Sequence, residues 1–182
     1  LSLSHTIGDS VVAYAEWSGA SEPGLIQRAL QYGEIAGSLP TGVSSLPGLG
    51  QGAHFSNDAS IGASWAGAKK LTVNFEYQFH QAGLSGNQLR QWLALANLQP
   101  ATYGEFFRYV RGYASDQQEP LVRRQYFVRA DCVDAFVRNL ELSAFAFVDA
   151  TDGSGFTQFS ASYYASNHWT LGVLFGGSWG GR

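Results

Sequence analysis

The residues best suited to chemistry are the histidines, and only one of them stands in an informative pattern. The four histidines are His5, His54, His80 and His168. Their spacing does not match a metal site, and the single cysteine, Cys132, offers no partner thiolate. His80 follows Glu76 and Gln78 at intervals of two residues, so a strand would place the three on one face. His80 could act there as an acid or base, although a histidine at the wet rim of a polar surface is the commoner arrangement.

Other catalytic patterns are absent from the sequence. There is no G-x-S-x-G elbow, and no Ser-His-acid set can be identified. The glycine-rich stretch 47–52 lacks the Lys and Ser/Thr of a phosphate loop, so we read it as an ordinary loop. We therefore expect no enzyme, no cofactor and no metal. The absence of a basic stripe with interleaved aromatic residues also gives no reason to expect a nucleic-acid partner.

The histidine lies in the clearest structural pattern of the chain, residues 71–80. Leu71, Val73, Phe75, Tyr77 and Phe79 alternate with five polar residues. This period of two predicts a β-strand with one apolar and one polar face.

Similar alternation occurs throughout the chain and predicts eight strands. They cover 1–7, 10–17, 58–66, 70–80, 121–132, 140–148, 158–165 and 169–179. The connections alternate between tight turns and longer segments, of which 18–56 and 81–120 are the longest. Both long segments contain residues typical of a short helix, at 21–30 and 87–97. The sequence thus predicts an all-β fold with antiparallel hairpins.

The composition indicates what the apolar faces contact. Hydrophobic residues make up 45% and charged residues 14% of the 182 residues, whereas a soluble domain has about 25% charged residues. No run of 18 apolar residues exists, so bundled membrane helices are not expected. Strands of this length, low charge and unequal connections are typical of a transmembrane β-barrel with short periplasmic turns and long extracellular loops.

Two segments, 58–85 and 156–179, resemble bacterial outer-membrane β-barrels of the porin-like kind. Each reads as a strand, a tight turn, an aromatic-flanked strand and small residues. The resemblance concerns architecture and identifies no particular family. It implies a single barrel segment over 1–182 in the bacterial outer membrane, with extracellular loops at 18–56 and 81–120.

The strand order adds an expectation about the size of the barrel. If the short turns are periplasmic, both ends of the chain lie on the extracellular side. Single-chain barrels usually begin and end in the periplasm, and the usual terminal aromatic residue is missing here. We therefore expect at least one further strand before Leu1 and another after Arg182.

If the strands form a barrel, the residues on its two faces have different predicted roles. Candidate lumen-lining residues are Glu16, Asn74, Glu76, Gln78, His80, Arg129, Glu141 and Ser160. Candidate interface aromatics are Trp17, Trp65, Tyr77, Phe79 and Trp169. Arginines 123, 124 and 129 could form a transverse field with Glu76 and Glu141, although mutual pairing of these charges is the simpler interpretation.

Three functions remain open from the sequence. The first is a porin-like channel for small solutes, embedded in the lipid bilayer. The second is a structural barrel whose extracellular loops bind a protein or polymer partner. The third is a soluble secreted β-sandwich or lipocalin-like binding protein, because alternating strands are also common in half-buried sheets.

Overall fold

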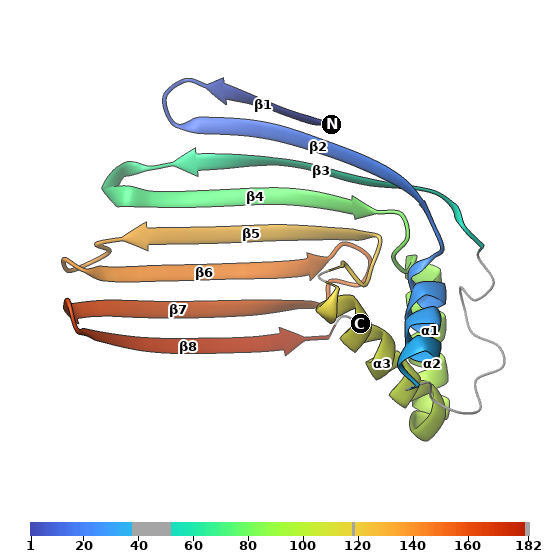
Figure 1. Ribbon diagram of the computed structural model, residues 1–182. Coiled ribbons are helices and arrows are strands. Elements are labelled where there is room, and N and C mark those ends of the chain that lie inside the picture. Colours follow the sequence, from blue (N-terminus) through green and yellow to red (C-terminus); the bar gives the residue numbers. More distant parts are fainter. Residues whose placement is uncertain (38–51, 118, 181–182) are drawn as a thin grey trace. The chain divides into compact units, whose positions relative to one another are not determined.

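The computed structural model describes residues 1–37, 52–117 and 119–180 and contains one eight-stranded sheet. The strands are paired in sequence order from β1 to β8 (Figure 1), and the β1–β2, β5–β6, β6–β7 and β7–β8 ladders are antiparallel. Their bounds are β1 Ser2–Ile7, β2 Val11–Glu22, β3 His54–Ala66, β4 Leu71–His80, β5 Arg124–Val133, β6 Leu140–Asp149, β7 Gly155–Ser166 and β8 Trp169–Trp179. The eight strands expected from the alternation are therefore confirmed, and so is a mainly β fold.

The strand boundaries differ most from expectation in β2 and β3. β2 continues to Glu22, where the sequence suggested the start of a helix, and β3 begins at His54 rather than at residue 58. The β2 extension consists mainly of Ser, Gly and Ala, and the β3 extension has one apolar residue, Phe55, so backbone pairing rather than side-chain pattern reveals both.

The sheet is open in the described part of the chain. β1 and β8 are its two edges, and no ladder between described residues joins them. The expected closed barrel is therefore not shown.

The described residues of the two long connections form three α-helices. They are α1 Leu25–Ala36, α2 Gly86–Leu98 and α3 Glu105–Asp116, with the π-turn η2 Pro100–Gly104 before α3. The 3₁₀ turn η1, Ala68–Lys70, joins β3 to β4. Helices at 21–30 and 87–97 were expected, and the first begins later than expected, at Leu25, whereas α3 was not expected. None of the helices in the described ranges is long and apolar enough to cross a membrane.

The described chain divides into two compact units. The sheet unit comprises Leu1–Trp17, Ala59–Gln78 and Arg124–Arg182, and the helical unit comprises Ser18–Asp58 and Phe79–Arg123. The stretch expected to be a loop at 47–52 lies outside the described residues except for Gly52. The two long connections thus supply a folded unit and not only loops.

All the buried hydrophobic residues of the described chain belong to the helical unit. Its core contains Leu25, Ile26, Ala29, Leu84, Leu89, Trp92, Phe106, Val110, Ala114 and Val122. Trp92 of α2 stacks on Phe106 of α3 with ring centroids 5.4 Å apart. Since the hydrophobic effect is the main favourable term in folding, this core explains why α1, α2 and α3 pack together.

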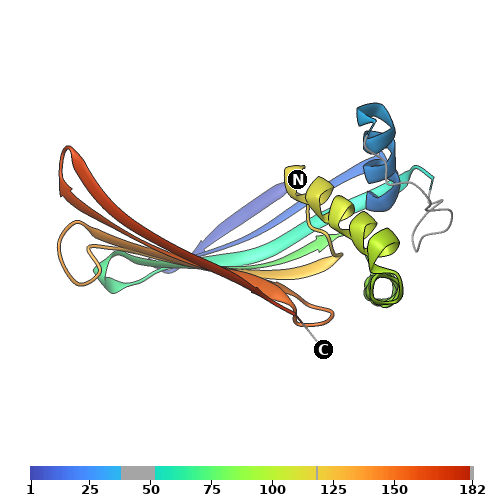
Figure 2. The ribbon, with the colours of Figure 1, turned by 90° about the horizontal axis from the view of Figure 1, so that it is seen from below.

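The strand register divides the sheet unit into two faces. In the β5–β6 ladder, Arg129 lies opposite Phe145 and Asp131 opposite Ser143, so odd-numbered residues of both strands share a face. In β7 and β8 the even-numbered residues lie on this face. It is called the polar face below, and the opposite one the apolar face. Figure 2 shows the twist of these strands.

Candidate functional site

The most extensive polar arrangement of the sheet unit is a row of hydrogen bonds across the polar face. The hydroxyl of Tyr14 donates to Oε2 of Glu76 at 2.7 Å, and the Gln78 amide donates to Oε1 at 2.5 Å. Gln125 in turn donates to the side-chain oxygen of Gln78. Because both carboxylate oxygens of Glu76 are occupied, its side chain is held in one position.

The row of hydrogen bonds depends on a glycine of β3, the strand between β2 and β4. Tyr14 belongs to β2 and Glu76 to β4, so the tyrosine must cross β3. It crosses at Gly62, where a Cβ atom would lie 2.7 Å from the tyrosine ring and 2.5 Å from the carbonyl oxygen of Phe75. Glycine is the residue that leaves room for this crossing.

Other charged residues of the polar face pair locally. Arg129 forms two hydrogen bonds with Asp131, at 2.7 Å and 3.0 Å. Glu141 accepts a hydrogen bond from the Tyr164 hydroxyl at 3.0 Å. The pairing of Arg129 with Glu76 or Glu141, which the sequence suggested, is therefore replaced by pairing within β5, where Arg129 and Asp131 are two residues apart on one face.

The remaining arginines of the suggested set point to different surroundings. The guanidinium of Arg123 donates to the backbone oxygen of Gly83, inside the helical unit. Arg124 begins β5 and falls on the apolar face by alternation. Glu16, Asn74 and Ser160 lie on the polar face of β2, β4 and β7, as expected from their sequence positions.

Four phenylalanines interrupt the polar face and were not expected there. Phe127 of β5 and Phe147 of β6 lie opposite each other, with ring centroids 4.8 Å apart. Phe145 contacts Phe147 edge-on at 5.7 Å and Phe156 of β7 at 6.0 Å. The polar face therefore combines a hydrogen-bonded row with an aromatic patch.

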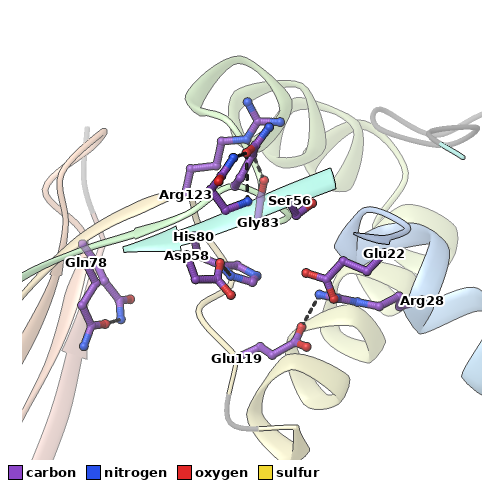
Figure 3. Close-up of polar contacts among 12 residues, drawn as sticks. Glu22, Arg28, Ser56, Asp58, Gln78, His80, Gly83, Glu119 and Arg123 are labelled. Carbon is purple, nitrogen blue, oxygen red and sulfur yellow. Dashed lines mark hydrogen bonds and ion pairs between the residues drawn. The ribbon is translucent and has the colours of Figure 1, made fainter. Parts of the chain in front are cut away.

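His80 lies in the helical unit and is buried rather than at a wet rim. Only 7% of its surface is exposed, and its Nδ1 lies 2.6 Å from Oδ1 of Asp58 (Figure 3). The opposite ring nitrogen, Nε2, is buried without a hydrogen-bond partner. Asp58 is therefore the polar partner that the structure provides for this buried ring.

A second ion-pair group organises the helical unit. Arg28 of α1 pairs with Glu22 at the end of β2 and with Glu119, the latter at 2.6 Å (Figure 3). Tyr109 of α3 donates to the backbone oxygen of Ala29 in α1 at 2.9 Å. These contacts fix α1 against the segment that contains α3.

The apolar face of the sheet unit is almost free of charge. In the described strands of this unit it carries no Asp, Glu or Lys and one arginine, Arg124, at the start of β5. Large side chains on this face are widely exposed: Ile61, Trp65, Phe75, Tyr126, Val128, Phe159, Tyr163, Trp169, Leu171, Val173 and Phe175.

The expected interface aromatics differ in their surroundings. Trp65 and Trp169 are at strand ends next to short turns and are exposed, and Trp17 is also exposed. Tyr77 packs against Tyr126 of β5 with ring centroids 5.4 Å apart. Phe79 is half-buried and belongs to the helical unit.

The described residues contain no group of three or more His, Cys, Asp or Glu side chains that could hold a metal ion. Comparison with family models, curated proteins and solved structures found no match to this chain. The geometry of the sheet unit itself defines the candidate site: an apolar face with one charged residue, Arg124, on one side and a hydrogen-bonded polar face on the other.

Proposed function

We propose that this chain forms part of an outer-membrane β-barrel that passes small solutes. The observation that carries the proposal is the exposed apolar face, which holds a single charged residue in the described strands of the sheet unit. Soluble monomers rarely expose apolar patches larger than a few hundred Å². A bilayer would cover this face without requiring another protein layer.

The opposite face supports a water-filled lumen. Tyr14, Glu76, Gln78 and Gln125 satisfy one another's polar groups across neighbouring strands. Lumen-facing residues of porins are polar, while lipid-facing residues alternate with them along each strand. Strands β2 to β8 have 10 to 13 residues, which suits the length needed to cross a bilayer at a tilt.

Gel migration and conductance test this proposal together. The native polypeptide is purified in detergent, and an unheated and a boiled sample are compared by gel electrophoresis. A folded barrel keeps its structure in the unheated sample and unfolds on boiling, so the two samples migrate differently. We expect a heat-dependent shift, and stepwise single-channel currents after reconstitution in planar bilayers. Protein that is soluble without detergent and shows no shift would contradict the membrane assignment.

A partner-binding barrel is the second candidate, and the helical unit is the observation that favours it. α1, α2 and α3 share a core with Trp92 and Phe106 at its centre, so the long connections form a folded body. Folded connections suit recognition of a protein or polymer outside the membrane. A heat-dependent shift without any conductance would favour this candidate over the channel.

A further inference from the structure

Two neighbouring short turns of the sheet unit contain all the left-handed, non-glycine residues of the described chain. Lys69 and Lys70 have φ angles of 58° and 55° in the β3–β4 turn. Asp134 and Asn139, with φ angles of 55° and 68°, are in the β5–β6 turn. Such conformations cost energy for residues other than glycine and cluster where the surrounding structure enforces them.

Polar contacts enforce this backbone and join the two turns. Nζ of Lys70 lies 2.5 Å from Oδ2 of Asp134, while Oδ1 of Asp134 accepts a hydrogen bond from the Asn139 amide at 2.7 Å. The hydrogen bond from Lys70, with that from Asn139, lowers the pKa of Asp134. The carboxylate is therefore ionised at neutral pH. The two turns, residues 68–70 and 134–139, are linked by this ion pair into one surface, called the turn patch below.

The turn patch is basic and apolar at once. Lys69, Lys70 and Arg138 supply three cations against the single carboxylate of Asp134, a net charge of +2 in a chain of net charge −3. Lys69 and Arg138 form no ion pair with any described residue. Phe136 is 85% exposed and Val137 55% exposed at the tip of the same surface.

The position of the turn patch continues the apolar face of the sheet. The β3–β4, β5–β6 and β7–β8 turns lie at the same end of the sheet (Figure 1). Trp65 is the penultimate residue of β3, four residues before Lys69, and Trp169 begins β8 at this end. An apolar band followed by aromatic and then basic residues is the order found from hydrocarbon to headgroups in membrane proteins.

We infer that the turn patch binds the anionic headgroups of phospholipids in the leaflet next to the short turns. The cations match the lipid phosphate in charge, and Phe136 and Val137 match the acyl–headgroup boundary. A free phosphate ion would not explain the exposed apolar tip. The inference rests on the proposed membrane location and adds the lipid class that this end of the sheet selects.

Quenching of tryptophan fluorescence by brominated lipid tests the inference on the full chain. Wild type is reconstituted in phosphatidylcholine vesicles that contain dibrominated phosphatidylglycerol or, at equal mole fraction, dibrominated phosphatidylcholine. Trp65 and Trp169, two of the five tryptophans, lie next to the short turns and supply the part of the quenching that depends on lipid there. We expect stronger quenching by phosphatidylglycerol. In the double variant Lys69→Gln/Arg138→Gln, the preference for phosphatidylglycerol should fall by about 30-fold, about fivefold for each cation removed.

The matched control removes two exposed arginines from α3, in the variant Arg108→Gln/Arg111→Gln. It should keep the preference of wild type, and inorganic phosphate at constant ionic strength should not displace the lipid. Equal quenching by the two lipids in wild type, or an unchanged preference in the Lys69/Arg138 variant, would overturn the inference.

Heat-dependent gel migration of the same samples separates this result from failure of the proposed function. A shift without lipid preference refutes only the turn patch. Without a shift, the membrane assignment fails. Co-sedimentation of the soluble chain with phosphatidylglycerol vesicles, compared between wild type and the same variants, then tests whether the turn patch binds anionic lipid.

Discussion

At the scale of single residues, Gly62 is the position where the polar face allows least change. A Cβ atom there would meet both the Tyr14 ring and a backbone oxygen of β4. We expect Gly62→Ala to lower the free energy of unfolding by about 1–3 kcal/mol, because overpacking displaces neighbouring atoms. Urea titration of the refolded protein in detergent micelles measures this change.

Gly172 provides the matched control for this substitution. A Cβ atom at Gly172 would approach its nearest neighbour, the Ala161 oxygen, at the ordinary distance of 3.8 Å. Gly172→Ala should therefore leave the unfolding midpoint nearly unchanged. Equal effects of the two substitutions would show that Tyr14 does not cross the sheet at Gly62.

Trp92 is the residue on which the helical core depends most. It is fully buried and stacks on Phe106 and Phe107. Trp92→Ala should cost about 3–5 kcal/mol, since a large cavity would remain. Loss of amide protection in α2 and α3, measured by hydrogen exchange, checks this expectation.

The control for Trp92 is a large apolar residue at the surface of the same unit. Leu98 ends α2 and is highly exposed, so Leu98→Ala should change stability by less than about 0.5 kcal/mol. Comparable loss of protection in both variants would contradict the assigned core.

The positions of some single residues could not be predicted from the sequence. Phe145 and Phe147 alternate with Ala144 and Ala146, and both sets are apolar, so periodicity alone could not assign them to the polar face. The burial of His80 depends on Asp58, 22 residues away in the chain. Neither the ring cluster nor this pair has a local signal.

At the scale of elements, the start of α2 has the clearest sequence signal. The Ser85 hydroxyl accepts a hydrogen bond from the backbone N–H of Gln88, while the Gln88 side-chain oxygen accepts one from the backbone N–H of Ser85. This capping box satisfies two amides that the helix leaves free. Ser85→Ala should therefore destabilise the protein by about 1 kcal/mol, measured by urea titration.

Ser115, in the last turn of α3, is the control for the helix cap. It contributes no cap, and alanine is a better helix former, so Ser115→Ala should be neutral or slightly stabilising. If Ser85→Ala had no larger effect than Ser115→Ala, the capping box would not contribute to stability.

Some strands and helices could be predicted from the sequence much better than others. The strand at 71–80 is nearly the same in sequence and structure, because each of its residues follows the alternation. α3 was missed although Phe106, Val110 and Ala114 recur at helical spacing. Its aromatic residues and Gly112 favour other conformations, and the shared core with α1 and α2 outweighs those preferences.

At the scale of the whole molecule, the two faces of the sheet predict opposite tolerance to charge. Val173 of β8 is on the apolar face, so Val173→Lys should reduce folding into vesicles by about 2–4 kcal/mol if lipid covers this residue. The fraction of protein that shows the heat-dependent gel shift measures folding.

Ser162 of β7, on the polar face, is the matched control. Ser162→Lys should fold into vesicles like wild type, because its side chain would face water in a lumen. Equal folding of the Val173→Lys and Ser162→Lys proteins would exclude lipid contact at Val173.

The division into two units was beyond the reach of the sequence. Segments 18–58 and 79–123 are separated by two strands, yet they share one core through Leu25, Leu84 and Val110. Helical spacing indicates single helices, but it contains no information about which distant helices pack together.

The central claim is that the apolar face of the sheet contacts lipid, and a nitroxide scan along β8 tests it most directly. With Cys132 replaced by serine, single cysteines are placed at positions 170 to 175, labelled, and reconstituted in vesicles. We predict high oxygen accessibility at Leu171, Val173 and Phe175, and access of a water-soluble nickel complex at positions 170, 172 and 174, which lie on the opposite face. Uniform access of the nickel complex along the strand would contradict the claim.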